Sequence, residues 1–205
     1  MNRAQLKSDA KIQIKGKIGI LFLITLIIGA ISFLAGLVLA FIPFVGPIIS
    51  SIIITPAFSL SIVRVYLSIC EGGTPSAGDA FSGFDDFWAA FKVTFFVGLY
   101  TFLWSLLLFV PGIIKALSYS MSMYILAENK GKSAHSCIRE SMEMTNGYKM
   151  DLFILGLSFI GWILLCCVTL GIAAIWVIPY MNATYANAYK SLKGDSDYGS
   201  SNYQY

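Results

Sequence analysis

Six apolar stretches dominate the sequence, and they are too long and too poor in charge to fold in water. A membrane-spanning helix needs about 20 mostly apolar residues, because the hydrocarbon core is about 30 Å thick and each helical residue rises about 1.5 Å. We therefore predict an all-α, polytopic membrane protein whose six transmembrane helices form three hairpins. The predicted spans cover residues 18–42, 48–70, 87–110, 113–127, 152–169 and 172–190.

The composition supports a lipid environment. Of the 205 residues, 57% are hydrophobic and 12% are charged, whereas a soluble domain is about 45–50% apolar and about a quarter charged. The first apolar run is far longer than the 7–15 residues or so of a signal peptide, so we expect an uncleaved first span. Residues 1–193 should form one membrane-embedded domain. The tail, residues 194–205, is rich in Ser, Asp, Gly and Tyr and should be disordered.

The turns between the paired spans carry few charges. We expect the chain to turn at 43–47, at Pro111–Gly112 and at Leu170–Gly171. Lys115 is the one basic residue near any of these turns. The positive-inside rule then predicts a multi-pass protein of the cytoplasmic membrane with both termini in the cytoplasm. The basic residues on the cytoplasmic side are Arg3, Lys7, Lys11, Lys15, Lys17, Lys130, Lys132, Arg139, Lys149, Lys190 and Lys193.

An amphipathic segment precedes each hairpin, and we expect it to lie in the cytoplasmic headgroup layer with its apolar face toward lipid. In the second segment we expect Thr74 to be the N-cap and Pro75 the first helical residue. The lysines of the first segment suit anionic lipid headgroups, although ordinary anchoring and topology setting are the preferred explanation. The apolar faces consist of Leu6, Ala10 and Ile14; of Ala77, Ala80, Phe81 and Phe84; and of Ala134, Cys137, Ile138, Ser141 and Met142.

The turn glycines Gly46, Gly112 and Gly171 recur at intervals of roughly 60 residues, a spacing that indicates repeats. Each repeat would consist of an amphipathic segment, an outgoing span, a tight turn and a return span. An even number of spans in each unit makes these parallel repeats. The alternative is that a membrane protein built from hairpins simply has short outer turns.

Polar residues concentrate on the return spans, the second, fourth and sixth. They could line a path for a solute, or they could act as structural glue by bonding to neighbouring backbone groups. Arg64 and Lys115 are functional candidates as charges inside spans, but both can also snorkel toward a membrane surface. No acidic residue lies inside a span to pair with either. The candidate intramembrane polar residues are Thr55, Arg64, Lys115, Ser118, Ser122, Asn182 and Thr184.

Signatures of catalysis or metal binding do not stand out in the sequence. His135, the single histidine, lies in a polar segment, and there is no paired-histidine metalloprotease motif, phosphate loop or nucleophile elbow. We interpret Asp79, Asp85 and Asp86 as a solvated helix end and the four cysteines as reduced. The sequence thus predicts no catalytic residue, no metal, no cofactor and no nucleic-acid partner, and it identifies no protein partner.

A series of motifs resembles a known family. The motifs are Phe109-Val110-Pro111-Gly112-Ile113-Ile114-Lys115, Tyr124-Ile125-Leu126-Ala127-Glu128-Asn129, Gly147-Tyr148-Lys149, Leu157-Ser158-Phe159-Ile160-Gly161-Trp162, Thr169-Leu170-Gly171 and Pro179-Tyr180. Together they resemble the bacterial membrane-protein family catalogued as domain of unknown function 975. The resemblance implies a multi-span fold in a cytoplasmic membrane of Gram-positive type, and it implies no activity.

Two functions are compatible with these observations. The first is a non-enzymatic protein that organises or assists other components of the cell envelope. The sparse intramembrane charge, the short outer turns and the amphipathic cytoplasmic segments favour it. The alternative is a transporter or channel for a small or amphiphilic solute along the second, fourth and sixth spans. A water-accessible cavity bounded by Thr55, Ser118 and Asn182 would favour transport.

Overall fold

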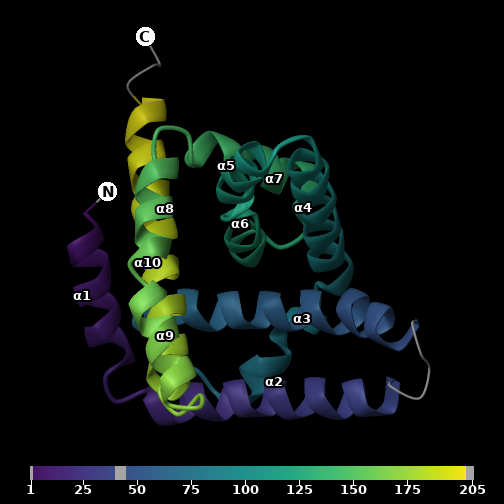
Figure 1. The fold of residues 1–205 in the computed structure, drawn as a ribbon. Helices are drawn as coiled ribbons and strands as arrows, with labels where there is room; N and C mark the ends of the chain where they lie inside the picture. The colour runs from purple at the N-terminus through teal and green to yellow at the C-terminus, as the bar shows by residue number, and fades with distance from the viewer. Residues whose placement is uncertain (1, 40–44, 202–205) are drawn as a thin grey trace.

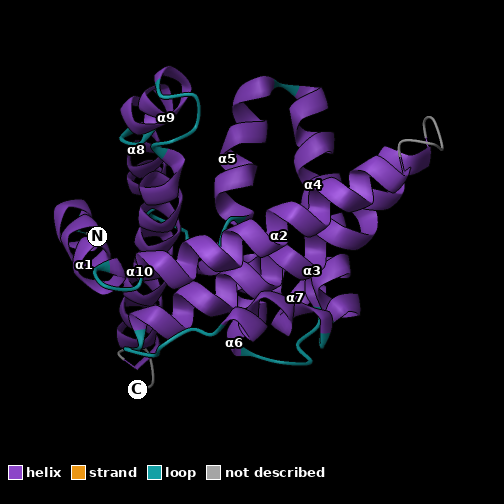
Figure 2. Ribbon diagram, turned by 90° about the horizontal axis from the view of Figure 1, so that it is seen from below, coloured by secondary structure: helices purple, strands orange, loops and turns teal. Residues whose placement is uncertain are grey.

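The computed structural model describes residues 2–39 and 45–201, and every regular element in these ranges is a helix (Figures 1 and 2). The elements are α1 (Arg3–Ile14), α2 (Ile18–Leu39), α3 (Val45–Cys70), the 3-10 helix η1 (Ala77–Phe84), α4 (Phe87–Leu107), α5 (Phe109–Tyr119), α6 (Ser122–Glu128), α7 (Ala134–Met144), α8 (Lys149–Leu157), α9 (Ile160–Val168) and α10 (Ala174–Ser201).

Four helical segments of the described chain are long and apolar enough to cross a membrane. The second half of α3, Ile54–Cys70, is apolar but shorter. The end of the predicted first span and the start of the predicted turn at 43–47, residues 40–44, lie outside the described residues. Residues 45–47 of that turn belong to the first turn of α3, so for them the prediction was wrong. The four segments are Ile18–Val38, Phe87–Leu107, Val110–Glu128 and Lys149–Val168.

Two of the predicted spans are interrupted helices. The fourth breaks between α5 and α6, and the fifth breaks between α8 and α9. At the breaks, the hydroxyls of Ser120 and Ser158 donate to the carbonyls of Leu117 and Leu155, three residues earlier. A serine hydroxyl that bonds nearby backbone competes with the regular helical pattern, which accounts for a bend at these positions.

The turns differ in detail from the prediction. The second turn lies at Leu108, which is extended, so the prediction of Pro111–Gly112 was wrong: both residues lie in the first turn of α5. Proline is tolerated there because its missing N–H would have no helical partner. A Cβ on Gly112 would lie 2.9 Å from the Cα of Ser105, so this glycine lets α5 approach α4 closely. The turn at Leu170–Gly171 is confirmed, since both residues have positive φ, 50° and 89°.

The last helix is longer than the predicted sixth span. It begins at Ala174 and continues to Ser201, through residues for which the composition predicted disorder. Residues 202–205 lie outside the described chain.

The helices do not form one parallel bundle. The α2–α3 pair runs across α4, α8 and α10, as both views show (Figures 1 and 2). Helix α1 lies beside α10, so the two ends of the chain are packed together (Figure 1). The sequence gives no indication of such crossing, because an apolar pattern specifies which residues are buried but not the direction of the neighbouring helix.

The apolar faces of the first and third amphipathic segments pack on protein, so the expectation that these two faces lie toward lipid was wrong. In the second segment, Phe81 and Phe84 remain 46% and 43% exposed. Leu6, Ala10 and Ile14 of α1 are buried, and α1 packs against α10. In η1 the N-cap is Ser76 rather than Thr74, and it forms a capping box with Asp79. The first and third faces find partners within the chain, which satisfies the same need for burial as lipid would.

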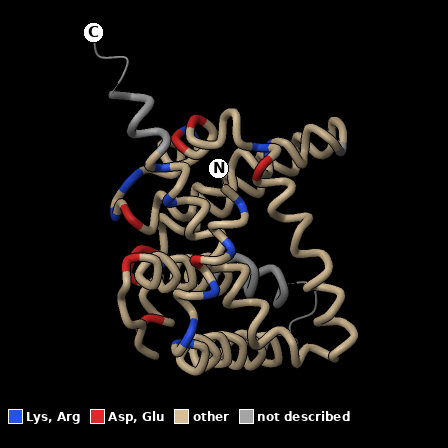
Figure 3. Tube along the Cα trace, turned by 90° about the vertical axis from the view of Figure 1, so that its left-hand side faces the viewer, with Lys and Arg blue, Asp and Glu red and all other residues tan. Residues whose placement is uncertain are grey.

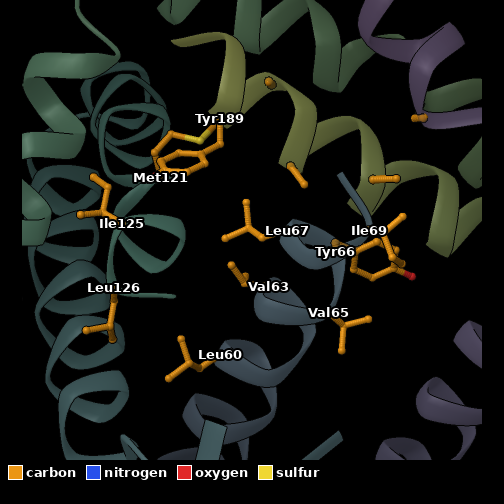
Figure 4. Close-up of a cluster of buried hydrophobic side chains, with 14 of the residues drawn as sticks. Leu60, Val63, Val65, Tyr66, Leu67, Ile69, Met121, Ile125, Leu126 and Tyr189 are labelled. Carbon is orange, nitrogen blue, oxygen red and sulfur yellow. The ribbon is translucent and has the colours of Figure 1, made fainter. Parts of the chain in front are cut away.

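The core surrounds the second half of α3 (Figure 4). Side chains on every face of this helix are buried, including Leu60, Tyr66 and Ile69. Met121 at the N-cap of α6, Ile125 and Leu126 of α6, and Tyr189 of α10 close the cluster.

Large apolar side chains remain exposed along α2, α4 and α9, whereas Lys, Arg, Asp and Glu gather toward one side of the described chain (Figure 3). Contiguous exposed apolar surface on this scale is unusual for a soluble protein and is typical of a membrane contact. Examples are Phe33, Leu34 and Val38 on α2; Phe102, Leu106 and Leu107 on α4; and Ile163, Leu164 and Val168 on α9.

Candidate functional site

Arg64 is held by an ion pair that the sequence analysis missed. Its guanidinium bonds the carboxylate of Asp86 and the carbonyl oxygen of Ser82, and the two charged side chains are only 13% and 21% exposed. The partner lies in the polar segment after α3 rather than inside a span, so counting acids within spans could not reveal it. Removing one partner of a largely buried ion pair strongly destabilises a protein, because the other charge is left uncompensated. We therefore infer that Arg64 of α3 holds η1, through Ser82, and the start of α4, through Asp86, in place.

Lys115 contacts an aromatic ring and lines a cavity. Its ammonium lies 4.8 Å from the centre of the Trp104 ring, a cation–π distance. Both residues line a cavity of about 650 Å³ between the α4–α5 pair and α7, which we call the basic–aromatic cavity. The cavity is lined by Tyr100, Trp104, Lys115, Tyr119, Ser133, His135, Ser136, Ile138, Arg139 and Met142.

The polar groups of the basic–aromatic cavity are cationic or neutral. Lys115, His135 and Arg139 line it, and none of its lining residues is acidic. Arg139 has an ion pair with Glu143 at 3.9 Å, but these side chains are 75% and 72% exposed, and such a surface pair contributes about 0–1 kcal/mol. Elsewhere the cations are neutralised more closely, as Lys132 is by Glu140. The cavity therefore has an excess of positive charge.

Helix α7 is fixed beside this cavity by buried hydrogen bonds. The Ser141 hydroxyl donates to the Ser118 carbonyl oxygen at 2.7 Å and accepts from the Met121 N–H at 3.2 Å. The Thr145 hydroxyl donates to the carbonyl of Ser141 at 2.8 Å. Near its first turn, the His135 ring lies 4.6 Å from the ring of Phe96, centre to centre. These contacts bring His135 and Arg139 into the lining of the same cavity as Lys115, which no spacing in the sequence indicates.

The remaining predicted polar residues do not meet in one place. The hydroxyls of Ser118 and Thr184 donate to carbonyls of their own helices, Ile114 at 2.8 Å and Tyr180 at 2.7 Å. Thr55 is exposed and Asn182 is half-buried. The cavities described here are lined by other residues.

Ser122 is a different case, because its hydroxyl is buried without a hydrogen-bond partner in the described chain.

The return spans do supply most of the buried polar side chains in the described chain, as predicted. Apart from Ser141 of α7 and Thr145 at its C-cap, the buried polar side chains that the structure describes are Ser61, Ser118, Ser122, Thr184 and Asn187. They belong to α3, α5, α6 and α10.

A second polar cavity, of about 470 Å³, lies where α3, α6 and α10 meet. The ammonium of Lys190 lies 2.6 Å from carboxylate oxygens of both Glu71 and Glu128. Glu128 also bonds Lys193 at 2.5 Å and accepts from the Tyr189 hydroxyl at 2.9 Å. These charges compensate one another, so this cluster braces the end of α10 and leaves little charge for a ligand.

Metal-binding geometry is not formed in the described part of the chain, where no group of three or more His, Cys, Asp or Glu side chains comes together. The described cysteines are free thiols, and Cys137 is buried. Burial raises the pKa of the Cys137 thiol, more than the nearby Lys132 lowers it. A raised pKa makes a thiol a poor nucleophile and a poor metal ligand at neutral pH.

One family model matches nearly the whole chain. It is described as "Protein of unknown function (DUF975)", and it matches residues 1–118 and 106–196. No curated protein and no solved structure matches the chain.

Proposed function

The chain belongs to the DUF975 family, and because that description assigns no activity, we propose a function from the geometry. We propose a non-enzymatic, multi-pass protein of the cytoplasmic membrane that organises or assists other envelope components. The observation that carries the proposal is the exposed apolar surface of α2, α4 and α9, combined with charges gathered on one side. Such a surface is stable in lipid and would aggregate in water.

The proposed topology has both termini in the cytoplasm. Four apolar segments support several crossings, and all the basic residues except Lys115 lie away from Leu108 and from the turn at Leu170–Gly171. Six upright spans would also require the α2–α3 pair to turn within the bilayer, because it runs across its neighbours (Figure 1).

An accessory role is favoured over transport. A solute path along the return spans needs polar side chains that converge, whereas Ser118 and Thr184 satisfy their hydroxyls within their own helices. That is the behaviour of structural glue. Arg64 of α3, Glu128 of α6 and Lys190 and Lys193 of α10 are likewise neutralised in ion pairs. The surfaces left over face lipid and partners rather than an internal passage.

Topology can be tested with single cysteines in a variant lacking Cys70, Cys137, Cys166 and Cys167. A membrane-impermeant maleimide added to intact cells should label Leu170→Cys in the outer turn and leave Lys130→Cys unlabelled until the cells are opened. Labelling of Lys130→Cys in intact cells would contradict the orientation. Full release of the protein by alkaline carbonate would contradict membrane integration.

The accessory role needs its own test. Protein purified from gently solubilised membranes should carry the same envelope component in independent preparations, and the component should be lost when detergent strips the exposed face of α4. Repeated recovery of the bare protein would contradict the role while leaving the topology intact.

A further inference from the structure

We propose that the basic–aromatic cavity binds the phosphate headgroup of an anionic glycerophospholipid, held between Lys115 and Arg139. The inference rests on the proposed membrane location but not on the accessory role. It concerns a part of the molecule distinct from the lysines of α1, which the sequence alone associates with lipid headgroups.

Charge is the first reason. Lys115 has no carboxylate partner in the described chain; its recorded contact is the Trp104 ring. Arg139 has only the long, exposed pair with Glu143. A phosphate oxygen is a strong acceptor that an ammonium and a guanidinium can share, and the guanidinium fork can bind two oxygens at once. His135 adds a ring donor at the same cavity.

The walls of the cavity are the second reason. Tyr100, Trp104 and Tyr119 supply aromatic surface with polar tips, the combination that suits the boundary between headgroups and acyl chains. Next to them, Leu107, Val110 and Ile114 are exposed at the end of the α4–α5 pair. A bound lipid can therefore place its phosphate among the cations and its chains on this apolar surface.

Size and contrast complete the argument. A volume of about 650 Å³ lies within the range of about 300–1,000 Å³ that is usual for ligand sites. The apolar groove between α2 and α10, of about 430 Å³, has no charged lining residue. In the cavity where α3, α6 and α10 meet, Glu71 and Glu128 form ion pairs with Lys190 and Lys193 and neutralise them. Among the cavities described here, the basic–aromatic cavity best combines unneutralised cations with an apolar approach.

The test is native mass spectrometry of the full-length protein, delipidated in a neutral detergent and titrated with defined ligands. Phosphatidylglycerol should bind at least tenfold more tightly than phosphatidylcholine of the same chain length. Lys115→Gln and Arg139→Gln should each weaken phosphatidylglycerol binding about fivefold, which corresponds to about 1 kcal/mol. The double variant should weaken it about 25-fold. Lys130→Gln, which removes the same charge from an exposed loop, is the control and should bind like the parent.

A variant that keeps full affinity separates the site from a folding defect. Glu143→Gln frees the guanidinium of Arg139 from its weak partner, so it should bind phosphatidylglycerol at least as tightly as the parent. Equal binding of phosphatidylglycerol and phosphatidylcholine would overturn the proposal, as would equal binding by the double variant and Lys130→Gln. Inorganic phosphate that competes as well as the lipid would show a free-phosphate site and would also overturn it. These failures would leave carbonate resistance and cysteine labelling unchanged, so they can be told apart from a failure of the proposed function.

Discussion

Gly83 is the point at which η1 touches α3 most closely, and replacing it should loosen the whole docked segment. A Cβ at this position would lie 2.8 Å from both the backbone nitrogen and the hydroxyl of Ser61, and closer still to the carbonyl oxygen of Ala57. Backbone atoms of α3 cannot move aside without breaking the helix. We therefore expect Gly83→Ala to push η1 away from α3.

The cost can be worked from the contacts that are lost. Overpacking of a tight interface costs about 1–3 kcal/mol. The displaced segment also loses the buried hydrogen bond from the Gly83 N–H to the Ser61 hydroxyl at 2.8 Å, which adds about 1–3 kcal/mol if the donor is left unsatisfied. The higher helical propensity of alanine offsets about 1 kcal/mol. The net loss in free energy of unfolding is about 1–5 kcal/mol, or about 2–20 °C in Tm for a chain of this length.

Thermal unfolding in detergent, followed by circular dichroism, measures this effect. The control is Gly78→Ala in the same short helix, where a Cβ would make only an ordinary 3.7 Å contact with the Ser76 hydroxyl. We expect this control to leave the Tm unchanged or slightly higher. Equal Tm values for the two variants would refute the close docking of η1 on α3.

Two further predictions concern buried polar groups. Arg64→Gln leaves the carboxylate of Asp86 mostly buried without its cation, so it should lower the free energy of unfolding by about 2–4 kcal/mol; an unchanged Tm relative to Lys130→Gln in a thermal scan would contradict this. The Cys137 thiol, whose pKa burial raises, should react slowly with a maleimide at pH 8 until the chain is denatured. Because the unfolded thiol loses its proton at lower pH than the folded one, raising the pH through 9 should lower the Tm, and Cys137→Ala should reduce that slope.

The features that could be predicted from the sequence are local ones. The predicted second span, residues 48–70, corresponds to α3, which begins at Val45 and ends at Cys70, because apolar composition and turn residues act over short distances. The apolar face of α1 was identified correctly, but not its partner: Asn187 of α10, whose amide donates to the Leu6 carbonyl at 3.3 Å. A hydrophobic face predicts that its side chains are buried, but it does not tell whether lipid or another helix buries them.

At the candidate site, too, the sequence indicated an individual residue but not the residues that it meets in the fold. The sequence identified Lys115 as a candidate because it is a charge inside a predicted span. In the structure it lines the same cavity as Arg139, which lies 24 residues later in the chain. What joins them is the pair of hydrogen bonds between Ser141 and the backbone of Ser118 and Met121. Serines in such positions have no sequence signature that distinguishes them from serines bonded to their own helix.

The contact between α1 and α10 has a consequence for biosynthesis. Gln13 and Asn187 exchange two side-chain hydrogen bonds, at 3.0 and 3.1 Å, across 174 residues of chain. Helix α1 is made before α10, so the part of its apolar face that packs on α10 stays uncovered until that helix has been made. Closing so long a loop is slow. Until α10 docks, that face is free to rest on the membrane surface or on an insertion factor, so the docking of α10 is the step that buries it.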